Sequence, residues 1–255
     1  MSSIIYGPVP SWRLGRSLGV DLLTGDGKTC SFDCIYCQLG RTARRLAVRA
    51  EFVPLSALAR ELEGARNVPA DYVTFSGMGE PTLASNLGDA LRLAREVLGL
   101  PTAVLTNSSL MAREDVRREL AYADVVVAKL DAPDEQLFRR INQALPSFSL
   151  TEIVESIELF RTAYTGKLAL QIMFVEANRD AARSMAAIAG KLSPDEVQIN
   201  TPLRPCPVRP LTTDEIAAIR EEFRMLPNVV TVYDAVRPEV VAIDVLETRR
   251  RRPET

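Results

Sequence analysis

Hydrophobic positions along the chain form short continuous runs that alternate with longer segments of helical spacing. The short runs are rich in Val, Ile and Leu, which is typical of strands buried in a parallel sheet. These predicted strands lie at 17–23, 71–77, 102–107, 124–131, 168–175 and 196–201, and a further run at 229–235 is a candidate edge strand. Apolar residues recur at helical spacing at 55–64, 86–98, 113–121, 134–142, 150–163, 179–191 and 213–225.

Strands that alternate with helices predict a parallel sheet with helices packed outside it. Helix-start signals support several of the helices, for example Thr212 and Thr213 before Asp214 and Glu215. Six such βα units are too few for a closed eight-stranded barrel. We therefore expect an α/β fold built as an open, partial (β/α)6 TIM-like barrel, with a doubly wound sheet as the alternative.

The chain length suits one large α/β domain, which we expect over residues 1–245. Residues 246–255 include the arginine run at 249–252 and are expected to form a frayed, solvated basic tail. The longest apolar runs, such as 123–128, are too short to span a bilayer, and the first residues show no signal peptide. A cytoplasmic location without a membrane partner is the expectation.

Charge and composition exclude several classes of function. The net charge of −2 indicates no general affinity for a polyanionic partner. The chain contains no histidine at all. That absence excludes a Ser-His-Asp triad, a Cys-His protease and any zinc site with histidine ligands.

Polar residues gather where the predicted strands end. In parallel α/β folds, the loops after the carboxyl ends of the strands carry the chemistry. The residues at these positions are Ser76, Gly77, Met78, Gly79, Glu80, Thr106, Asn107, Ser108, Lys129, Asp131, Asn200 and Thr201. We expect these residues to meet at one mouth of the barrel, together with a cysteine-rich loop that follows the first predicted strand.

Three of the four cysteines, Cys30, Cys34 and Cys37, form a C-x3-C-x2-C motif in that loop. In a cytosolic chain such clusters bind metal or carry out redox chemistry more often than they form disulfides. A structural zinc site needs a fourth ligand, which here would be Cys206 or a carboxylate. A cubane [4Fe–4S] cluster takes thiolates on separate irons, and three thiolates leave one iron open to bind something else.

The cysteine motif, with Tyr36 directly before its last sulfur, resembles the signature of the radical S-adenosylmethionine (SAM) superfamily. Further segments, in order from about residue 5 to about residue 245, resemble the subgroup related to tRNA wyosine-base synthases. These segments read "GPVPSWRLGRSLGVDLL", "FSGMGEPTL", "LTNSSLM", "VVAKLDAPDEQLFRRIN" and "VQINTPLRP". The resemblance implies the radical SAM fold and an enzyme of this superfamily.

The resemblance also implies the cofactors. A [4Fe–4S] cluster would be held by Cys30, Cys34 and Cys37, and SAM would chelate the open iron through its amino and carboxylate groups. An electron from the cluster would cleave SAM, and the resulting 5′-deoxyadenosyl radical would abstract a hydrogen atom from the substrate. A flavodoxin or ferredoxin would be a suitable electron donor. The protein would supply ligation, orientation and shielding.

By the same resemblance, Tyr36 is expected near the SAM adenine. Gly77, Met78, Gly79 and Glu80 resemble the Gly-Gly-Glu motif of the superfamily, with Met78 in the place of one glycine. Glycines allow the backbone to come close to the methionine part of SAM, and free carbonyls or Glu80 can accept from its ammonium group. Without the cysteine motif, this run would be read as an ordinary turn.

Later strand ends supply further candidates. Asn107 and Ser108 can reach ribose hydroxyls or the SAM carboxylate, and Asn200 and Thr201 can contact adenine or ribose. Gln171 lies on a predicted strand, but periodicity does not decide which face it occupies.

Lys129 ends a strongly apolar predicted strand, where a lysine is costly to bury without a partner. One interpretation has Lys129 holding the SAM carboxylate or a substrate anion, with Asp131 nearby. The alternative is a structural ion pair between Lys129 and Asp131.

The chain also departs from its apparent relatives. Wyosine-base synthases of the archaeal and eukaryotic type need further cysteines for a second cluster, and only Cys206 remains here. Longer relatives continue into a small winged-helix-like module, of which residues 246–255 resemble the start. Cys206 is either an inert, partly buried cysteine or a substrate contact at the barrel mouth. The substrate therefore stays open among small molecules, peptides and tRNA, and a non-catalytic iron–sulfur or SAM-binding protein is the alternative from another class.

Overall fold

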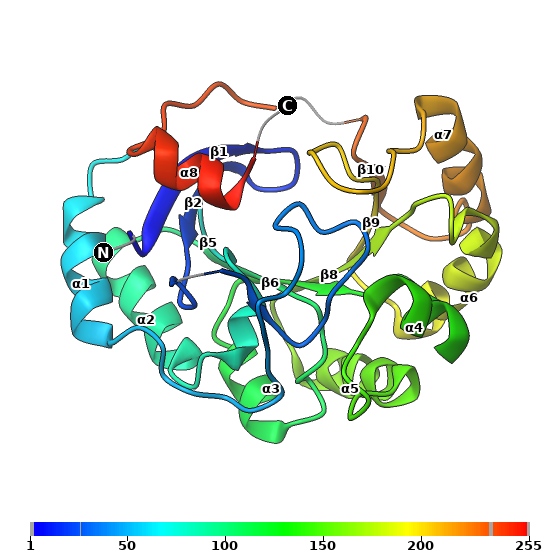
Figure 1. Cartoon of the computed structure of the whole chain (residues 1–255), viewed down its shortest axis with the longest axis horizontal. Helices are drawn as coiled ribbons and strands as arrows, with labels where there is room; N and C mark the ends of the chain where they lie inside the picture. The colour runs from blue at the N-terminus through cyan, green and yellow to red at the C-terminus, as the bar shows by residue number, and fades with distance from the viewer. Residues whose placement is uncertain (1–2, 26, 235–236, 254–255) are drawn as a thin grey trace.

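One curled sheet of eight strands forms the centre of the molecule (Figure 1). The computed structural model describes residues 3–25, 27–234 and 237–253. The order across the sheet is β1-β2-β5-β6-β7-β8-β9-β10. The strands are β1 (Ile5–Ser11), β2 (Gly15–Val20), β5 (Tyr72–Phe75), β6 (Thr102–Thr106), β7 (Val125–Lys129), β8 (Lys167–Met173), β9 (Glu196–Asn200) and β10 (Val229–Thr231). A separate two-stranded sheet pairs β3 (Thr29–Cys30) with β4 (Arg44–Arg45).

All neighbours from β2 to β10 pair in parallel, and only β1 runs antiparallel to its partner β2. All seven predicted strands are present in the predicted order, including the edge strand β10. The prediction of an open, partial TIM-like barrel of the radical SAM type is confirmed, since the sheet curls into a half-barrel (Figure 1).

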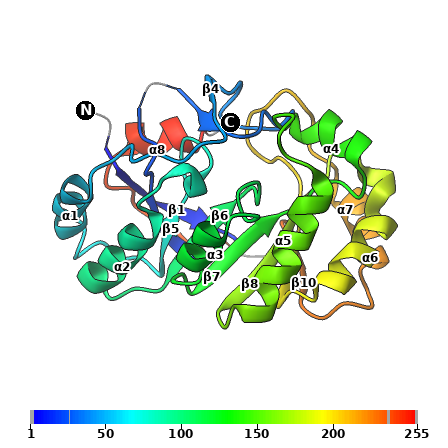
Figure 2. The same ribbon diagram turned by 90° about the horizontal axis from the view of Figure 1, so that it is seen from below.

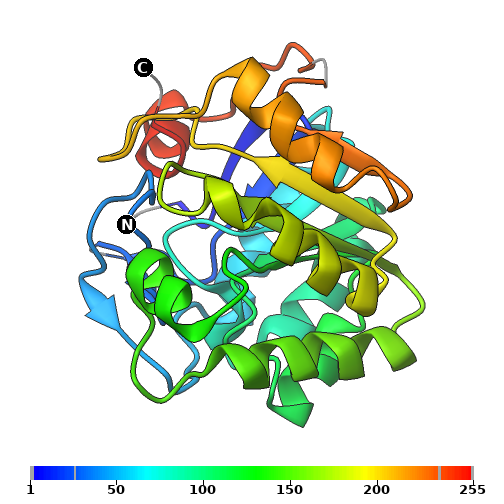
Figure 3. The same ribbon diagram turned by 90° about the vertical axis from the view of Figure 1, so that its right-hand side faces the viewer.

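Helices cover the outer face of the curled sheet, as Figures 1, 2 and 3 show from three directions. The α-helices are α1 (Leu55–Gly64), α2 (Leu87–Leu98), α3 (Glu114–Leu120), α4 (Glu135–Asn142), α5 (Leu150–Ala163), α6 (Ala182–Leu192), α7 (Thr213–Glu222) and α8 (Val245–Arg251). Two 3-10 turns are η1 (Pro81–Leu83) and η2 (Arg179–Ala181). None of the helices in the described ranges is long and apolar enough to cross a membrane.

Local sequence explains where several helices begin. Thr212 and Glu215 form a reciprocal capping box at the start of α7, and the Ser149 hydroxyl accepts from the Glu152 N–H at the start of α5. The apolar faces of the helices then pack on the strands to form the main core. Burial of this face, rather than helix propensity alone, stabilises such short helices.

The turn between β1 and β2 closes one end of the barrel interior. Leu14, at this turn, packs against Ala103, Val125, Val127 and Ala169, which lie on β6, β7 and β8. These residues belong mostly to the first halves of their strands. The opposite end, where the strands finish, is therefore the open mouth.

The expectation of a frayed, solvated tail at the C-terminus is wrong for the residues that the structure describes. Residues Val245–Arg251 form α8, which packs against β1, and the side chain of Arg251 is 0% exposed. The sequence window shows only a run of like charges, whereas Asp21 and Thr24, two partners of Arg251, come from the other end of the chain. A continuation into a winged-helix-like module stays a prediction.

Candidate functional site

The cysteine loop follows β2 and docks on the end of α4. The backbone N–H groups of Asp33 and Ile35 donate to the carbonyls of Asn142 and Ile141, each at 3.0 Å. Cys30 is buried, Cys34 and Cys37 are partly exposed, and all three are free thiols. The loop is therefore held in place by backbone hydrogen bonds, and its three cysteines form no disulfide bond with one another.

The sulfur atoms of Cys30, Cys34 and Cys37 all lie near the ammonium group of Lys28. Its ammonium group is buried, and burial works against the charge, but the sulfurs of Cys37, Cys30 and Cys34 together raise the pKa of Lys28. Burial raises the pKa of the Cys30 thiol to about 12, against the pull of Lys28. A bound metal would favour the thiolate instead, because metal ligation deprotonates cysteine.

The arrangement of ligands bears on the kind of metal group that could fit. Within residues 3–25, 27–234 and 237–253, no three His, Cys, Asp or Glu side chains are placed to hold one metal ion. A cubane cluster makes a different demand, because each thiolate binds a separate iron. Three free thiols spread around one buried ammonium fit that demand.

Lys129 and Asp131 do form the ion pair that the sequence left as an alternative. The Lys129 Nζ lies 2.9 Å from Asp131 Oδ2, 2.8 Å from the Tyr36 hydroxyl and 3.3 Å from Cys34 Sγ. Asp131 also accepts from the Tyr36 hydroxyl and from the Asn142 amide, and its Oδ1 accepts from the Met173 N–H at 2.9 Å. This buried network ties the cysteine loop to β7, α4 and β8.

The network keeps a positive charge beside one cysteine. Burial disfavours the charged form of Lys129, but Asp131 and Cys34 outweigh it and raise its pKa. The ammonium group lies 3.3 Å from Cys34 Sγ. The contacts of Lys129 are thus directed to the cysteine loop.

The glycines of the "SGMGE" segment occupy positions where a side chain would collide. A Cβ on Gly79 would lie 1.5 Å from the Thr29 carbonyl oxygen, and one on Gly77 would lie 2.4 Å from Asp21 Cγ. Both glycines also have positive φ angles, 138° at Gly77 and 158° at Gly79. Without side chains at these positions, the segment lies close to the start of the cysteine loop, where the Thr29 N–H donates to the Met78 carbonyl at 2.8 Å.

Glu80 is engaged within the protein. Its carboxylate accepts from the N–H and hydroxyl of Thr82, the hydroxyl of Thr106 and the N–H of Asn107, at 2.6 to 3.0 Å. Burial raises the pKa of Glu80, while these four donors act in the opposite direction. The carboxylate therefore braces the ends of β5 and β6 against each other.

Asn107 and Ser108 also face the cysteine loop. The Asn107 amide donates to Ser31 Oγ at 2.8 Å and approaches Cys30 Sγ at 3.5 Å. Ser108 adopts a positive φ of 69°, and its hydroxyl donates to the Lys129 carbonyl at 3.1 Å. The structure thus brings the strand-end residues of β6 and β7 together around the cysteines.

Tyr36 and Asn200 line a cavity of about 230 Å³ inside the barrel, together with Thr201. Gln171, whose face the sequence left open, lines the same cavity. The cavity also contains Arg13, whose Nη1 donates to Gln171 Oε1 at 2.9 Å. Cys206 packs near Tyr36, and its thiol donates to the Val208 carbonyl at 3.1 Å.

The sequence reasoning missed several residues of this region. They are Arg13, Asp21, Lys28, Asn142, Gln198 and Arg251. Lys28 and Asp21 flank the cysteine motif and could have been found by their position. The others lie far from it in sequence, and no local pattern marks them.

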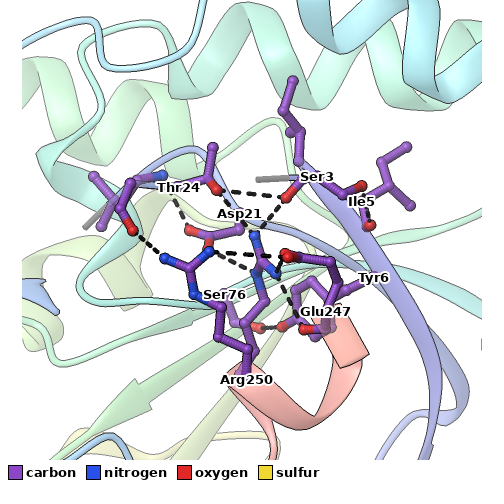
Figure 4. A network of polar contacts seen from close by, with 12 residues as sticks. Ser3, Ile5, Tyr6, Asp21, Thr24, Ser76, Glu247 and Arg250 are labelled. Carbon is purple, nitrogen blue, oxygen red and sulfur yellow. Dashed lines mark hydrogen bonds and ion pairs between the residues drawn. The ribbon is translucent and has the colours of Figure 1, made fainter. Parts of the chain in front are cut away.

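Asp21 connects the glycine segment to the C-terminal helix (Figure 4). Arg251 Nε donates to Asp21 Oδ2 at 2.8 Å, and Asp21 in turn accepts from the backbone N–H of Leu23 and of Met78. Arg251 also donates to Glu247 Oε2 at 2.6 Å and to Thr24 Oγ1 at 3.0 Å. The buried arginine of α8 therefore supports the loop that carries Gly77.

Comparisons with known proteins identify the family of this chain. The model of the radical SAM superfamily matches residues 26–185. A UPF0026 protein of Synechocystis is 39% identical over 206 residues, which cover 80% of this chain and 77% of the relative.

Two solved structures share the fold at low identity. TYW1 with a lysine-pyruvate adduct has a TM-score of 0.63 and 16% identity, over 82% of this chain and 73% of the other. Streptococcus suis SuiB bound to S-adenosylmethionine has a TM-score of 0.65 and 16% identity, over 86% and 50% respectively. At this identity the likeness shows the fold alone.

Proposed function

The chain belongs to the radical SAM superfamily, and on that premise we propose that it is a single-cluster radical SAM enzyme. Cys30, Cys34 and Cys37 bind one [4Fe–4S] cluster, and SAM binds its open iron. When bound, the cluster would supply one electron for the cleavage of SAM into methionine and a 5′-deoxyadenosyl radical, which would take a hydrogen atom from a substrate to become 5′-deoxyadenosine.

One observation carries this proposal: three free cysteine thiols lie around the buried ammonium of Lys28 at the mouth of a half-barrel. The mouth adjoins a cavity that Tyr36, the neighbour of Cys37, helps to line. A reactive radical needs a site that excludes water, and a barrel interior of this kind provides one.

The chain's own residues divide into two groups in this proposal. Lys28 and Lys129 keep positive charge beside the sulfurs, and Asp131 and Asn142 hold Lys129 and the loop in position. A second group contacts SAM directly: Tyr36, Gly77, Met78, Gly79, Asn107, Ser108 and Asn200. Glu80 acts through the strand ends that it braces, because its carboxylate already accepts four hydrogen bonds.

The substrate and the electron donor are separate questions. TYW1 shares the fold, so wyosine-type modification of a tRNA base stays an alternative, although this chain lacks cysteines for a second cluster. We keep a flavodoxin or ferredoxin as the expected donor and the cytoplasm as the expected location. A protein that binds the cluster or SAM without catalysis is the alternative from another class.

Anaerobic reconstitution with iron and sulfide tests the ligand set. We expect iron content and the reduced-cluster EPR signal to collapse in Cys30→Ala, Cys34→Ala and Cys37→Ala. Cys206→Ala is the matched control, since the Cys206 thiol of the wild type donates a hydrogen bond to the Val208 carbonyl. Equal loss of the cluster in Cys206→Ala would show that the ligand set is wrong.

Incubation of the reconstituted protein with dithionite and SAM tests the reaction. Slow formation of 5′-deoxyadenosine and methionine is expected even without substrate, because chelation places the sulfonium beside the cluster. An intact, reducible cluster with bound SAM but no 5′-deoxyadenosine would contradict the enzymatic function and favour the non-catalytic alternative.

A further inference from the structure

Arginines from separate segments line the barrel cavity. Arg13 comes from the turn between β1 and β2, Arg204 from the loop after β9, and Arg252 from the residue after α8. Arg237 lines the same space. Among the described residues, no Asp or Glu lines this cavity, although the chain as a whole has a net charge of −2. The cavity is therefore positive in an otherwise slightly acidic protein.

Arg13 has unused hydrogen-bonding capacity inside the cavity. Its Nη1 donates to Gln171 Oε1 at 2.9 Å and approaches Gln198 Oε1 at 3.5 Å, and both acceptors are neutral. Its Nε is buried and has no hydrogen-bond partner within the described part of the chain. A guanidinium presents five N–H donors in a fixed fork, and a buried donor without an acceptor is costly. The position of Arg13 is thus suited to an acceptor that a ligand would bring.

Arg252 lies near the same space with neutral partners. Its Nη2 donates to Ser76 Oγ at 2.9 Å and its Nη1 to the Arg251 carbonyl at 3.0 Å. Burial, together with the charges of Arg252 and Arg204, lowers the pKa of Arg13 to about 10. The arginines repel one another in the structure, and an anion between them would turn this repulsion into attraction.

We propose that this cavity binds an anionic group of the substrate, a carboxylate or a phosphate, with Arg13 and Arg252 as its charged ligands. The inference rests on the proposed radical SAM function, which places the reacting carbon in the same cavity. Arginine is suited to this role because its planar fork can donate two parallel hydrogen bonds to a carboxylate or phosphate. The volume of about 230 Å³ suits a small molecule or the end of a larger one.

The carboxylate of SAM is a poor candidate for the Arg13 position. That carboxylate is expected on the open iron beside the cysteines, whereas Arg13 contacts Gln171 on β8 and Gln198 on β9. The cavity extends from Arg13 to Tyr36, which directly precedes Cys37. A ligand held by Arg13 and a SAM molecule near Tyr36 would therefore occupy one continuous space, as hydrogen transfer requires.

A second cavity, of about 300 Å³, adjoins the first and shares Arg204, Arg237 and Arg252 with it. Arg249 lines it as well, and again no Asp or Glu does so among the described residues. Clefts lined by charge of one sign attract ligands of the opposite sign. The second cavity is thus a suitable approach route for an anion.

Calorimetric titration with simple anions tests this inference. The probes are inorganic phosphate and succinate, added at low ionic strength to cluster-loaded protein that is saturated with SAM and held without reductant. Wild-type protein should bind one of them saturably. Saturation by phosphate would indicate a phosphate-bearing substrate, and saturation by succinate a carboxylate. Binding should weaken by about tenfold or more in Arg13→Gln and in Arg252→Gln, as expected for loss of a charge-assisted hydrogen bond.

Arg66→Gln is the matched control, because Arg66 is half-exposed and already paired with Glu63. It should bind the anion as the wild type does. Arg13→Lys keeps the charge without the fork and should bind with intermediate affinity, which preserves the test if Arg13→Gln folds poorly. Failure of both anions to saturate the wild type, or unchanged affinity in Arg13→Gln and Arg252→Gln, would overturn the inference.

Comparison of this titration with the 5′-deoxyadenosine assay on the same cluster-loaded protein separates this inference from the proposed function. Protein that binds the anion but forms no 5′-deoxyadenosine would contradict the proposed function alone. Protein that forms 5′-deoxyadenosine but binds neither anion would contradict the anion site alone.

Discussion

Arg251 is fully buried and Arg13 is partly buried, and their surroundings differ. Arg251 has a side chain that is 0% exposed, and carboxylates of Asp21 and Glu247 lie within 2.8 Å of its nitrogens. Arg13 meets the amide oxygens of Gln171 and Gln198 and keeps a buried Nε without a partner in the described chain. Carboxylates contact the charge of Arg251 directly, whereas no carboxylate of the described residues contacts that of Arg13.

This difference indicates a structural role for Arg251 and a binding role for Arg13. A buried charge is costly unless carboxylates and hydrogen bonds compensate for it. Compensation around Arg251 joins α8 to the loop of Asp21 and so to Gly77. Around Arg13 the protein tolerates an incomplete set of contacts, which is typical of binding sites, where a ligand completes them.

The largest effect is expected for Arg251→Met. Removal of the arginine leaves the carboxylate of Asp21 buried and unpaired, so the free energy of unfolding should fall by about 3–5 kcal/mol. Urea denaturation followed by circular dichroism measures it. The control is Arg66→Met, since Arg66 is half-exposed and its ion pair with Glu63 should contribute about 0–1 kcal/mol. Equal losses in the two variants would mean that burial of Arg251 does not matter.

A smaller loss is expected when Asp21→Asn is added to Arg251→Met. The asparagine carries no charge, and its oxygen can still accept from the Leu23 N–H, as Asp21 Oδ1 does. The double variant should therefore lose only about 1–3 kcal/mol, the range for missing hydrogen bonds. A double-mutant cycle gives the coupling energy. A double variant no more stable than Arg251→Met would exclude the unpaired carboxylate as the source of the loss.

A still smaller change is expected for Arg13→Met. No carboxylate contacts Arg13 in the described structure, so an apolar side chain of similar length should change the free energy of unfolding by less than about 1 kcal/mol, or increase it. The same denaturation measurement applies. A loss as large as that of Arg251→Met would show that Arg13 is structural and would remove the contrast between the two sites.

The smallest effect is expected at the partly exposed Glu215. A side-chain hydrogen bond from Arg209, followed by the Thr212 N–H, lowers the pKa of Glu215 from 4.5 to about 2. Because the folded-state pKa is depressed, the stabilisation is present above pH 4.5 and is lost as the pH falls towards 2. The melting temperatures of wild type and Glu215→Gln should therefore converge over that window. A gap that stays constant with pH would contradict the assignment.

Much of the fold was predictable from local pattern. Seven strands and the helices from α1 to α7 lie close to their predicted ranges, because buried faces impose a periodicity that short windows reveal. The antiparallel strand β1 and the helix α8 were missed. These two elements pack against each other although they lie at opposite ends of the chain, so no short window of sequence contains both.

Much of the candidate site was predictable as well, but its internal contacts were not. The cysteine spacing and the strand-end residues named the right region, and the structure brings Asn107, Ser108 and Lys129 around the cysteine loop. The sequence could not decide between two roles for Lys129. The structure shows the ion pair with Asp131, whose geometry depends on how the end of β7 presents both side chains to Tyr36 and α4.

The sequence by itself determined seven strands of the main sheet, the helices from α1 to α7, the parallel arrangement of the strands and the three-cysteine motif. These features depend on residues that are neighbours along the chain, through periodicity and spacing. Only the tertiary structure decided which arginines are compensated. Arg251 meets Asp21 across 230 positions, and Arg13 meets Gln171 across 158. The energy of a buried charge depends on the groups packed around it, and those groups are assembled only when distant segments fold together.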